Sequence, residues 1–314
     1  MYYRRLDGGS APWTSDPVLG AYRFTNAYRA ADRVSQYLIS EVQYHPTRSQ
    51  EPEEVFFRTL LFKVFNKIDT WESLEAAHGP LSWASSKLGE FDATLSRLID
   101  SGRPIYSAAY IMPAPAFGEQ RKHSNHLKLI AKMMDDRLPD RLRQAPDLKS
   151  VYECILAYPG LGRFLAFQYA IDLNYSSLLD FPEADFVVAG PGALDGISKC
   201  FASIGGRTSE ALIQWVTERQ GDEFAARDLA FPGLYGRPLQ PIDCQNLFCE
   251  ISKYARVAHP EVVGVANRLR IKQSYKATKR DLSPPTFPPR WGLRVPTYST
   301  RSRRELSVHQ AVLL

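Results

Sequence analysis

The chain has 314 residues, a formal net charge of +5 and 23% charged residues, which indicates a soluble globular protein of one or two domains. Its four cysteines are too few for a disulfide scaffold and favour a reducing cytoplasm, and no apolar stretch is long enough to span a membrane. No apolar run follows the arginines near the start, so we expect no signal peptide.

The charge is distributed unevenly along the chain. Residues 251–314 carry thirteen Lys/Arg and three Asp/Glu, a net charge of +10, whereas residues 1–250 carry 26 and 31, a net charge of −5. A basic C-terminal segment is what phosphate binding requires, although a charge run by itself more often marks a solvated tail.

Residues 1–20 are expected to form an irregular leader. Thr25 or Asn26 is expected to cap a helix that runs to about Tyr44, with an apolar stripe along one side. Four polar residues share the opposite face: Arg29, Asp32, Arg33 and Gln36. Spacing alone favours a solvated face with ion pairs. The functional interpretation makes Asn26, Arg29, Arg33 and Gln36 an anion site, because guanidinium groups bind phosphate bidentately.

The helices expected between residues 52 and 135 are interpreted as structural, with apolar faces in the core and polar faces at the surface. Pro52 opens a helix whose apolar face, residues 57–68, is interpreted as core, and Thr70 is expected to cap a short helix ending at residue 79. Further helices are expected over residues 88–99, 106–112 and 119–135. His123 and His126 lie three residues apart on the last of these. Two histidines do not make a metal site, so we expect an exposed face, no metal and no cofactor.

Residues 154–192 form the stretch around which the chain is organised. Pro159, Gly160 and Gly162 predict a tight reversal between two helices, with Leu161 inside the turn and Arg163 opening the second helix. Backbone N–H groups of such a turn can approach a phosphate, and the second helix adds its positive end. Asp185 follows this helix. The alternatives are a plain helical connection, and a helix cap or ion-pair partner for Asp185.

The remaining helices are expected over residues 193–204, 209–219 and 241–256, with a turn-rich loop over 231–238. Asp243 and Glu250 share one face of the last helix and could complete a site with Asp185 and Arg29, although cross-bracing ion pairs are a comparable interpretation. Cys244 and Cys249 are interpreted as packing residues.

The chain changes character from Lys276. A proline-rich run over 283–289 and a basic run over 301–304 predict an extended tail over 276–314, following one helical domain over 21–275. Alternating β-branched runs are few, so we expect a mostly α protein of about ten to fourteen helices, in two lobes with a cleft between them.

Two family resemblances bear on the function. Residues 158–162 and Asp185 resemble the helix-hairpin-helix DNA glycosylase superfamily. Residues 24–37 look like the opening motif of the α-glutamyl/putrescinyl thymine pyrophosphorylases and the helical domain of 5-hydroxymethyl-deoxyuridine DNA kinases, and this second resemblance continues through residues 57–66, 108–112, 158–162 and 243–250. It covers roughly residues 22–273 and implies a derivative of the glycosylase helical fold.

The second resemblance implies an enzyme that modifies a flipped, 5-hydroxymethyluracil-derived base in double-stranded DNA. In the expected reaction an amine displaces pyrophosphate from the base, Arg29 and Arg33 neutralise the leaving group, and Asp185 or Glu250 accepts the amine proton. One alternative is a glycosylase that excises a modified base. The second is a non-catalytic DNA-binding module that works with a separate DNA-base kinase, because no Gly-x4-Gly-Lys-Ser/Thr loop occurs in the sequence.

Overall fold

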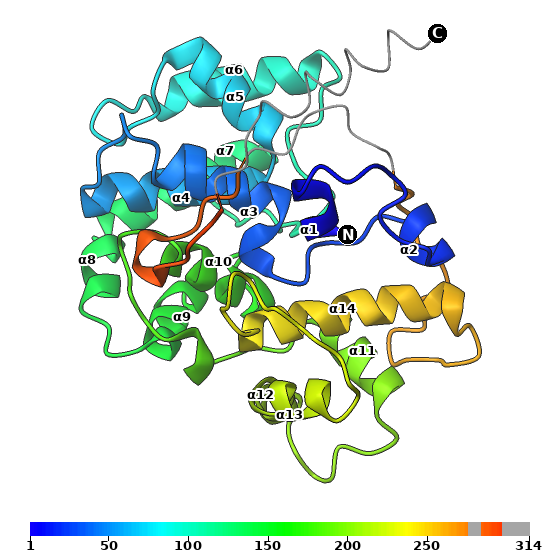
Figure 1. Ribbon diagram of the computed structural model, residues 1–314. Helices are drawn as coiled ribbons and strands as arrows, with labels where there is room; N and C mark the ends of the chain where they lie inside the picture. The colour runs from blue at the N-terminus through cyan, green and yellow to red at the C-terminus, as the bar shows by residue number, and fades with distance from the viewer. Residues whose placement is uncertain (276–283, 297–314) are drawn as a thin grey trace, which may run out of the picture.

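The computed structural model describes residues 1–275 and 284–296 and confirms a mostly α protein (Figure 1). Within these residues it has fourteen α-helices and no β-strand, with isolated bridges at Tyr22–Ser274 and Leu234–Arg237. The α-helices are α1 (Tyr2–Leu6), α2 (Pro17–Ala21), α3 (Arg33–Tyr37), α4 (Pro52–Phe65), α5 (Ile68–His78), α6 (Leu88–Asp100), α7 (Lys122–Asp135), α8 (Leu138–Arg143), α9 (Leu148–Leu156), α10 (Arg163–Asn174), α11 (Pro191–Cys200), α12 (Ser209–Glu218), α13 (Gln220–Ala225) and α14 (Pro241–Ala258). Four shorter elements are the 3-10 helices η1 (Arg29–Ala31), η3 (Glu183–Asp185) and η4 (Pro289–Trp291) and the π-helix η2 (Leu38–Gln43).

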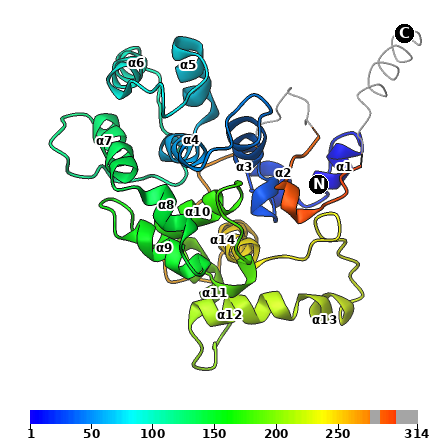
Figure 2. The ribbon, with the colours of Figure 1, turned by 90° about the vertical axis from the view of Figure 1, so that its left-hand side faces the viewer.

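The centre of the molecule is formed by α4 and α10, which pack against each other. Every residue of α4 from Glu54 to Phe65 is buried, as is α10 from Ala166 to Asn174. A helix that is apolar around most of its circumference must be covered on all sides. Accordingly, α5 and α6 lie on one side of this pair and α11 to α13 on the other (Figures 1 and 2).

The longest helix, α14, packs along α11 (Figure 2). The approach is so close that a Cβ atom at Gly196 of α11 would overlap the carbonyl oxygen of Phe248 on α14. Only glycine fits this position, because any side chain would push the two helices apart. The contact therefore fixes α14 against α11, the first α-helix after α10.

The expected single helix over residues 25–44 is wrong. The chain instead forms η1, breaks at Asp32 in extended conformation, and continues through α3 into η2. Asp32 caps α3 by accepting the backbone N–H of Val34, so neither Thr25 nor Asn26 is the cap. The break turns Arg29 toward the interior and leaves Arg33 exposed, and the shared polar face does not exist.

Three further expectations are corrected. The leader is not wholly irregular, because it contains α1 and α2. Residues 106–112 are not helical: Tyr110 has a φ of +55°, and Pro113 disfavours the helical conformation at Met112. His123 and His126 are fully buried, because Ser96 and Tyr106 give their rings hydrogen-bond partners inside the protein.

The segment 284–296 packs against the helical domain. Phe287 is buried, and the Gln36 side chain forms two hydrogen bonds with the backbone of Thr286, at 2.9 Å each. Arg290 donates to the carbonyls of Asn174 and Ser176 at the end of α10. The basic run over 301–304 lies outside the described residues.

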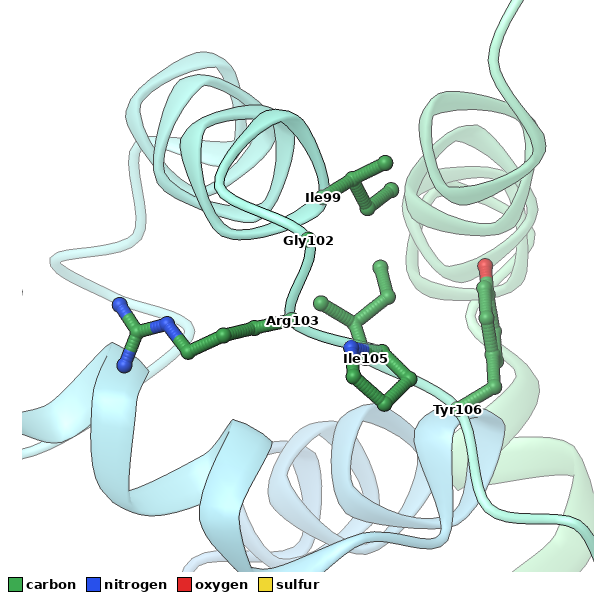
Figure 3. A pocket seen from close by; sticks show the side chains of 6 residues that line it. Ile99, Gly102, Arg103, Ile105 and Tyr106 are labelled. Carbon is green, nitrogen blue, oxygen red and sulfur yellow. The ribbon is translucent and has the colours of Figure 1, made fainter.

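A cavity of about 320 Å³ is lined by Ile99 at the end of α6 and by the segment that follows this helix, residues 102–106. Figure 3 shows Ile99, Ile105 and Tyr106 around this space, with the Arg103 side chain directed away from it. The expected division of the helices into two lobes about a cleft, with a glycosylase-like arrangement, stays a prediction.

Candidate nucleic-acid site

The reversal between α9 and α10, residues 158–162, is here called the hairpin turn. Gly160 has a φ of +82°, and a Cβ atom there would lie 3.2 Å from the carbonyl oxygen of Pro113. Leu161 is buried and anchors the turn, and the Tyr158 hydroxyl donates a 2.9 Å hydrogen bond to Asp136. The predicted tight turn between two helices is therefore present, and Gly160 has the left-handed conformation that the turn requires.

The N-terminus of α10 is open to ligands. Gly162 is exposed at the N-cap position and no side chain caps the helix, so the first N–H groups have no side-chain acceptor. Arg163 follows with a largely exposed side chain, 3.6 Å from the Glu210 carboxylate. Backbone N–H groups, the positive helix end and a guanidinium thus meet at one surface point, a combination suited to phosphate.

A second helix begins beside the hairpin turn. Gly190, the N-cap of α11, packs so closely on the Phe164 ring that a Cβ atom would lie 2.5 Å from it. Glu210 of α12 lies between the two helix starts, because it accepts the N–H of Ala189 at 3.2 Å as well as contacting Arg163. Its carboxylate therefore occupies a position in which an anion is stabilised.

Asp185 is exposed at the end of η3, on the connection between α10 and α11. Its backbone carbonyl accepts a 3.4 Å hydrogen bond from the Gln214 side chain. The neighbouring Glu183 has the opposite environment: it is buried, it pairs with Arg237 at 3.1 Å, and burial raises its pKa to about 7. The acid chosen from the sequence is thus solvent-accessible, whereas its neighbour is part of the interior.

Toward the C-terminal end of α10 lies a buried charge cluster of Arg29, Lys63 and Asp172. The Asp172 carboxylate contacts Arg29 Nη1 at 2.5 Å and Lys63 Nζ at 2.7 Å, and all three side chains are at most 5% exposed. Gln168 accepts a 2.9 Å hydrogen bond from Arg29 Nε. Two cations and one anion leave a net positive charge in a region of low dielectric constant.

The cluster shifts the pKa of each of its members. Burial lowers the pKa of Lys63 to about 8, although Asp172 opposes this shift. Burial by itself would raise the pKa of Asp172, but the charges of Arg29 and Lys63 hold this pKa below the ordinary value. Burial by itself would lower the pKa of Arg29, but Asp172 raises this pKa above the ordinary value. All three groups therefore remain charged in neutral solution, except for a minor neutral fraction of Lys63.

Aromatic rings connect the cluster with the hairpin turn. The ring of Tyr110 lies 4.1 Å from Lys63 Nζ and stacks on Phe164, with centroids 6.0 Å apart and an angle of 16° between the planes. Phe164 is in the first turn of α10. Tyr175 covers Arg29 from another side, with its ring centre 5.6 Å from the guanidinium carbon. The half-buried Tyr110 is thus the layer between the charge cluster and the surface.

The other residues expected at the site are engaged in contacts within the fold. Asp243 accepts the backbone N–H of Arg29 at 2.8 Å and that of Gln240 at 3.0 Å, and burial raises its pKa to about 6. Glu250 accepts the N–H of Thr25 at 3.1 Å and pairs with Lys253 at 2.6 Å.

The expected anion site on residues 26–36 is not assembled. Asn26 accepts the N–H of Tyr28, and its carbonyl receives the Asn246 side chain. The Gln36 side chain donates hydrogen bonds to the backbone carbonyls of Ala30 and Thr286. The structure brings only Arg29 to the charge cluster and separates it from Arg33, so these residues do not form one phosphate site.

Sequence reasoning missed Lys63, Asp172 and Tyr110. One signal was present: Lys63 and Asp172 each interrupt an apolar run within a helix, over residues 60–65 of α4 and 169–173 of α10. A charge that cannot reach solvent needs a partner of opposite charge. The buried lysine of α4 and the buried aspartate of α10 therefore predict that these two helices pack together.

Within residues 1–275 and 284–296, no group of three or more His, Cys, Asp or Glu side chains is placed to hold a metal ion. A separate search of the same residues found no helix with the length and apolar character that crossing a membrane requires.

Comparison with known proteins gives two matches. A protein-family model described as "5-hmdU DNA kinase, helical domain" matches residues 1–264. A curated relative, the 5-hmdU DNA kinase of Bacillus phage SP10, is 26% identical over 278 residues, which cover 81% of this chain and 42% of the relative. The chain therefore spans about two fifths of the length of that relative. No solved structure matches.

These matches correct the expected reaction. Both describe 5-hmdU DNA kinases, which transfer phosphate. The expectation of amine transfer with loss of pyrophosphate is therefore wrong, and so is the glycosylase alternative. Both descriptions name 5-hmdU DNA, which agrees with the expected context of DNA modification at 5-hydroxymethyluracil.

Proposed function

The chain belongs to the family of the 5-hmdU DNA kinase helical domain, and from this premise we propose that it binds DNA containing 5-hydroxymethyl-deoxyuridine for phosphorylation of the base. The observation that carries this proposal is the uncapped N-terminus of α10 at the hairpin turn, with Arg163 beside it. This arrangement offers N–H donors and one mobile cation to a DNA phosphate, and it requires no base contact.

The second helix start extends the same binding surface. When a phosphate approaches α10, Arg163 exchanges the Glu210 carboxylate for the phosphate oxygens, at little cost because the ion pair is exposed and 3.6 Å long. The buried charge cluster adds a fixed positive charge farther along α10, with Tyr110 between Lys63 and Phe164. The phosphate nearest the target nucleotide is thereby held, while the nucleotide itself turns out of the helix.

The chemistry at the base follows from phosphate transfer. The hydroxymethyl oxygen attacks the terminal phosphorus of a nucleoside triphosphate, an O–P bond forms, and the bond to the diphosphate leaving group breaks. The hydroxyl proton passes to a carboxylate, and we assign this role to Asp185 because it is exposed and follows the hairpin helices.

The donor site is assigned to a DNA-base kinase partner. This partner is a domain of the same polypeptide or a separate protein. The relative from phage SP10 supports this assignment, because more than half of its length lies outside the matched region.

Binding is tested with two fluorescent duplexes that differ only in one base, 5-hydroxymethyluracil or thymine. We expect salt-sensitive binding, tighter for the modified duplex, and a loss of about tenfold in affinity for Arg163→Gln. Arg103→Gln removes the same charge beside the cavity in Figure 3 and should bind like the wild type. Equal affinity of wild type and Arg163→Gln at low salt would remove the hairpin turn from the proposal.

The role of Asp185 is tested in the complete kinase with a radiolabelled phosphate donor. Asp185→Asn keeps the size of the side chain but cannot accept a proton. We expect unchanged DNA binding and melting temperature, together with loss of phosphate transfer to the modified base. Undiminished transfer by this variant would assign the proton to another group.

A further inference from the structure

A second cavity lies at the opposite end of α11 from the hairpin turn. It has a volume of about 290 Å³ and is enclosed by the C-terminal ends of α11 and α14 and by the chain that follows α14. Its polar lining comes from Lys199, Arg256, Asn267 and Arg268, and its apolar rim includes Val263 and Leu269. None of these residues belongs to the hairpin turn or the charge cluster.

The acid beside this cavity is bound mainly by groups other than the two arginines. Asp195 is buried and accepts hydrogen bonds from Ser252 Oγ and, at 2.7 Å, from the N–H of Ala266. Lys199 Nζ lies 3.3 Å from the same carboxylate, and both side chains are at most 4% exposed. The charges of Lys199 and Asp195 therefore cancel, and three of the roughly four acceptor positions of the carboxylate are occupied.

Arg256 and Arg268 are the uncompensated charges. Among the described residues, neither forms an ion pair with a carboxylate. Arg256 donates to two neutral oxygens, the Arg270 carbonyl and Ser252 Oγ, at 3.3 Å each. Its Nε is buried and has no acceptor among the described residues. Burial, reinforced by the charge of Arg268, lowers the pKa of Arg256, although Asp195 and Glu250 oppose the shift.

Helix capping explains part of this arrangement. Arginine and lysine in the last turn of a helix stabilise its negative end, and Lys199 donates to the Ser252 carbonyl at 3.2 Å. Capping does not account for the buried Nε without an acceptor. It also does not account for Arg268, which is supplied by the segment beyond α14 and is exposed.

We propose that this cavity binds a phosphate group through Arg256 and Arg268. Two guanidinium groups provide paired N–H donors that match phosphate oxygens, and the outer nitrogens of Arg256 have only two neutral acceptors, at 3.3 Å each. The volume is close to the lower limit of about 300 Å³ for small-molecule sites and fits a phosphate with its attached sugar. Val263 and Leu269, 62% and 67% exposed, form an apolar rim for that sugar.

The phosphate has two possible sources, the backbone of DNA or a free nucleotide. The first source, the backbone of DNA, rests on the proposed function that the chain binds DNA. The ten residues of α11 separate the cavity from the hairpin side by about 15 Å at 1.5 Å per residue, the length of about four to five nucleotide steps. One DNA strand can therefore reach both positions.

The test uses Arg268→Gln in the full chain, because Arg268 is exposed and its replacement leaves the core intact. A second variant, Arg256→Gln, removes the buried donor. Arg103→Gln is the control with the same change in charge, at an exposed residue that follows α6, a helix on the other side of α4 and α10 from α11 (Figure 1). Duplex DNA binding is measured over a series of salt concentrations, and ATP binding is measured by calorimetry.

For a backbone site we expect both variants to bind DNA about tenfold more weakly, with a salt dependence reduced by about one phosphate contact. For a nucleotide site we expect the ATP dissociation constant to rise about tenfold, with DNA binding unchanged. If both variants match Arg103→Gln in both assays, the cavity does not bind phosphate.

Arg163→Gln separates this inference from the proposed function. If Arg163→Gln weakens DNA binding while Arg256→Gln and Arg268→Gln change neither assay, the inference fails and the proposed function remains. If only the variants at the cavity have an effect, the phosphate site stands and the assignment of the hairpin turn fails.

Discussion

The two ends of α10 place charged groups in opposite environments. At the N-terminus, Arg163 has a side chain that is 73% exposed and lies 3.6 Å from Glu210. Near the C-terminus, Asp172 is 2% exposed and contacts Arg29 at 2.5 Å and Lys63 at 2.7 Å. One helix thus carries a loose ion pair in water and a tight cluster in the interior.

The difference separates binding from stability. An exposed pair contributes about 0–1 kcal/mol to folding, so Arg163 can leave Glu210 for a phosphate. A buried charge cannot exchange its partner for water, and removal of that partner leaves it uncompensated. The N-terminal end of α10 is therefore suited to ligands, and the C-terminal end fixes the helices around Arg29.

The largest expected effect is at the buried end. Asp172→Asn leaves Arg29 and Lys63 without a counter-charge, and we expect the free energy of unfolding to fall by about 3–5 kcal/mol. Chemical denaturation measures this change. Asp185→Asn, at an exposed acid, should change stability by less than about 0.5 kcal/mol. Similar values for the two variants would contradict the comparison.

A pH series tests Lys63 without disturbing its partners. Its pKa falls from the ordinary 10.5 to about 8 because of burial, so the unfolded chain holds more protons between these values. Stability tied to Lys63 is therefore complete above about pH 10.5 and lost as pH falls through about 8. From pH 7.5 to 9.5 we expect the wild type to gain about 1–2 kcal/mol relative to Lys63→Met. Parallel curves for the two proteins would show that Lys63 is solvated.

The hairpin turn is tested by Gly160→Ala. The φ of +82° is unfavourable for alanine, and the new Cβ atom meets the Pro113 carbonyl at 3.2 Å. We expect a loss of about 1–2 kcal/mol in stability and weaker DNA binding. Gly102→Ala is the matched control, because Gly102 has a φ of +78° with nothing within 4 Å of the added atom. A larger loss of stability for Gly102→Ala, or equal DNA affinities of the two variants, would contradict this role of Gly160.

The smallest effect is expected at Glu210, and its direction is a gain. Glu210→Gln keeps an acceptor for the Ala189 N–H but removes the negative charge beside Arg163. We expect DNA affinity to rise a few-fold at low salt, and this gain to vanish at high salt because the interaction is screened. Glu218→Gln, on the same helix, is the control. Weaker DNA binding by Glu210→Gln would show that the carboxylate supports the site.

Local sequence signals predicted much of the secondary structure. The helices α9 and α10, the turn at Gly160, and helices close to α6, α12 and α14 follow from apolar periodicity and from glycine, because these depend on near neighbours in the chain. The motif over residues 24–37 also indicated the family. The reaction did not follow from it, because members that share a fold differ in chemistry.

The contacts between distant segments were decided only by the tertiary structure. Arg29 and Asp172 are 143 residues apart, and Gln36 and Thr286 are 250 apart, so no local pattern reports either pair. The same limit applies to His126, which was expected on an exposed face because two histidines do not make a metal site, and whose ring Tyr106 and Pro113 contact in the interior. Burial of a polar group depends on whether a distant segment supplies its hydrogen-bond partner, and that partner is present only once the chain has folded.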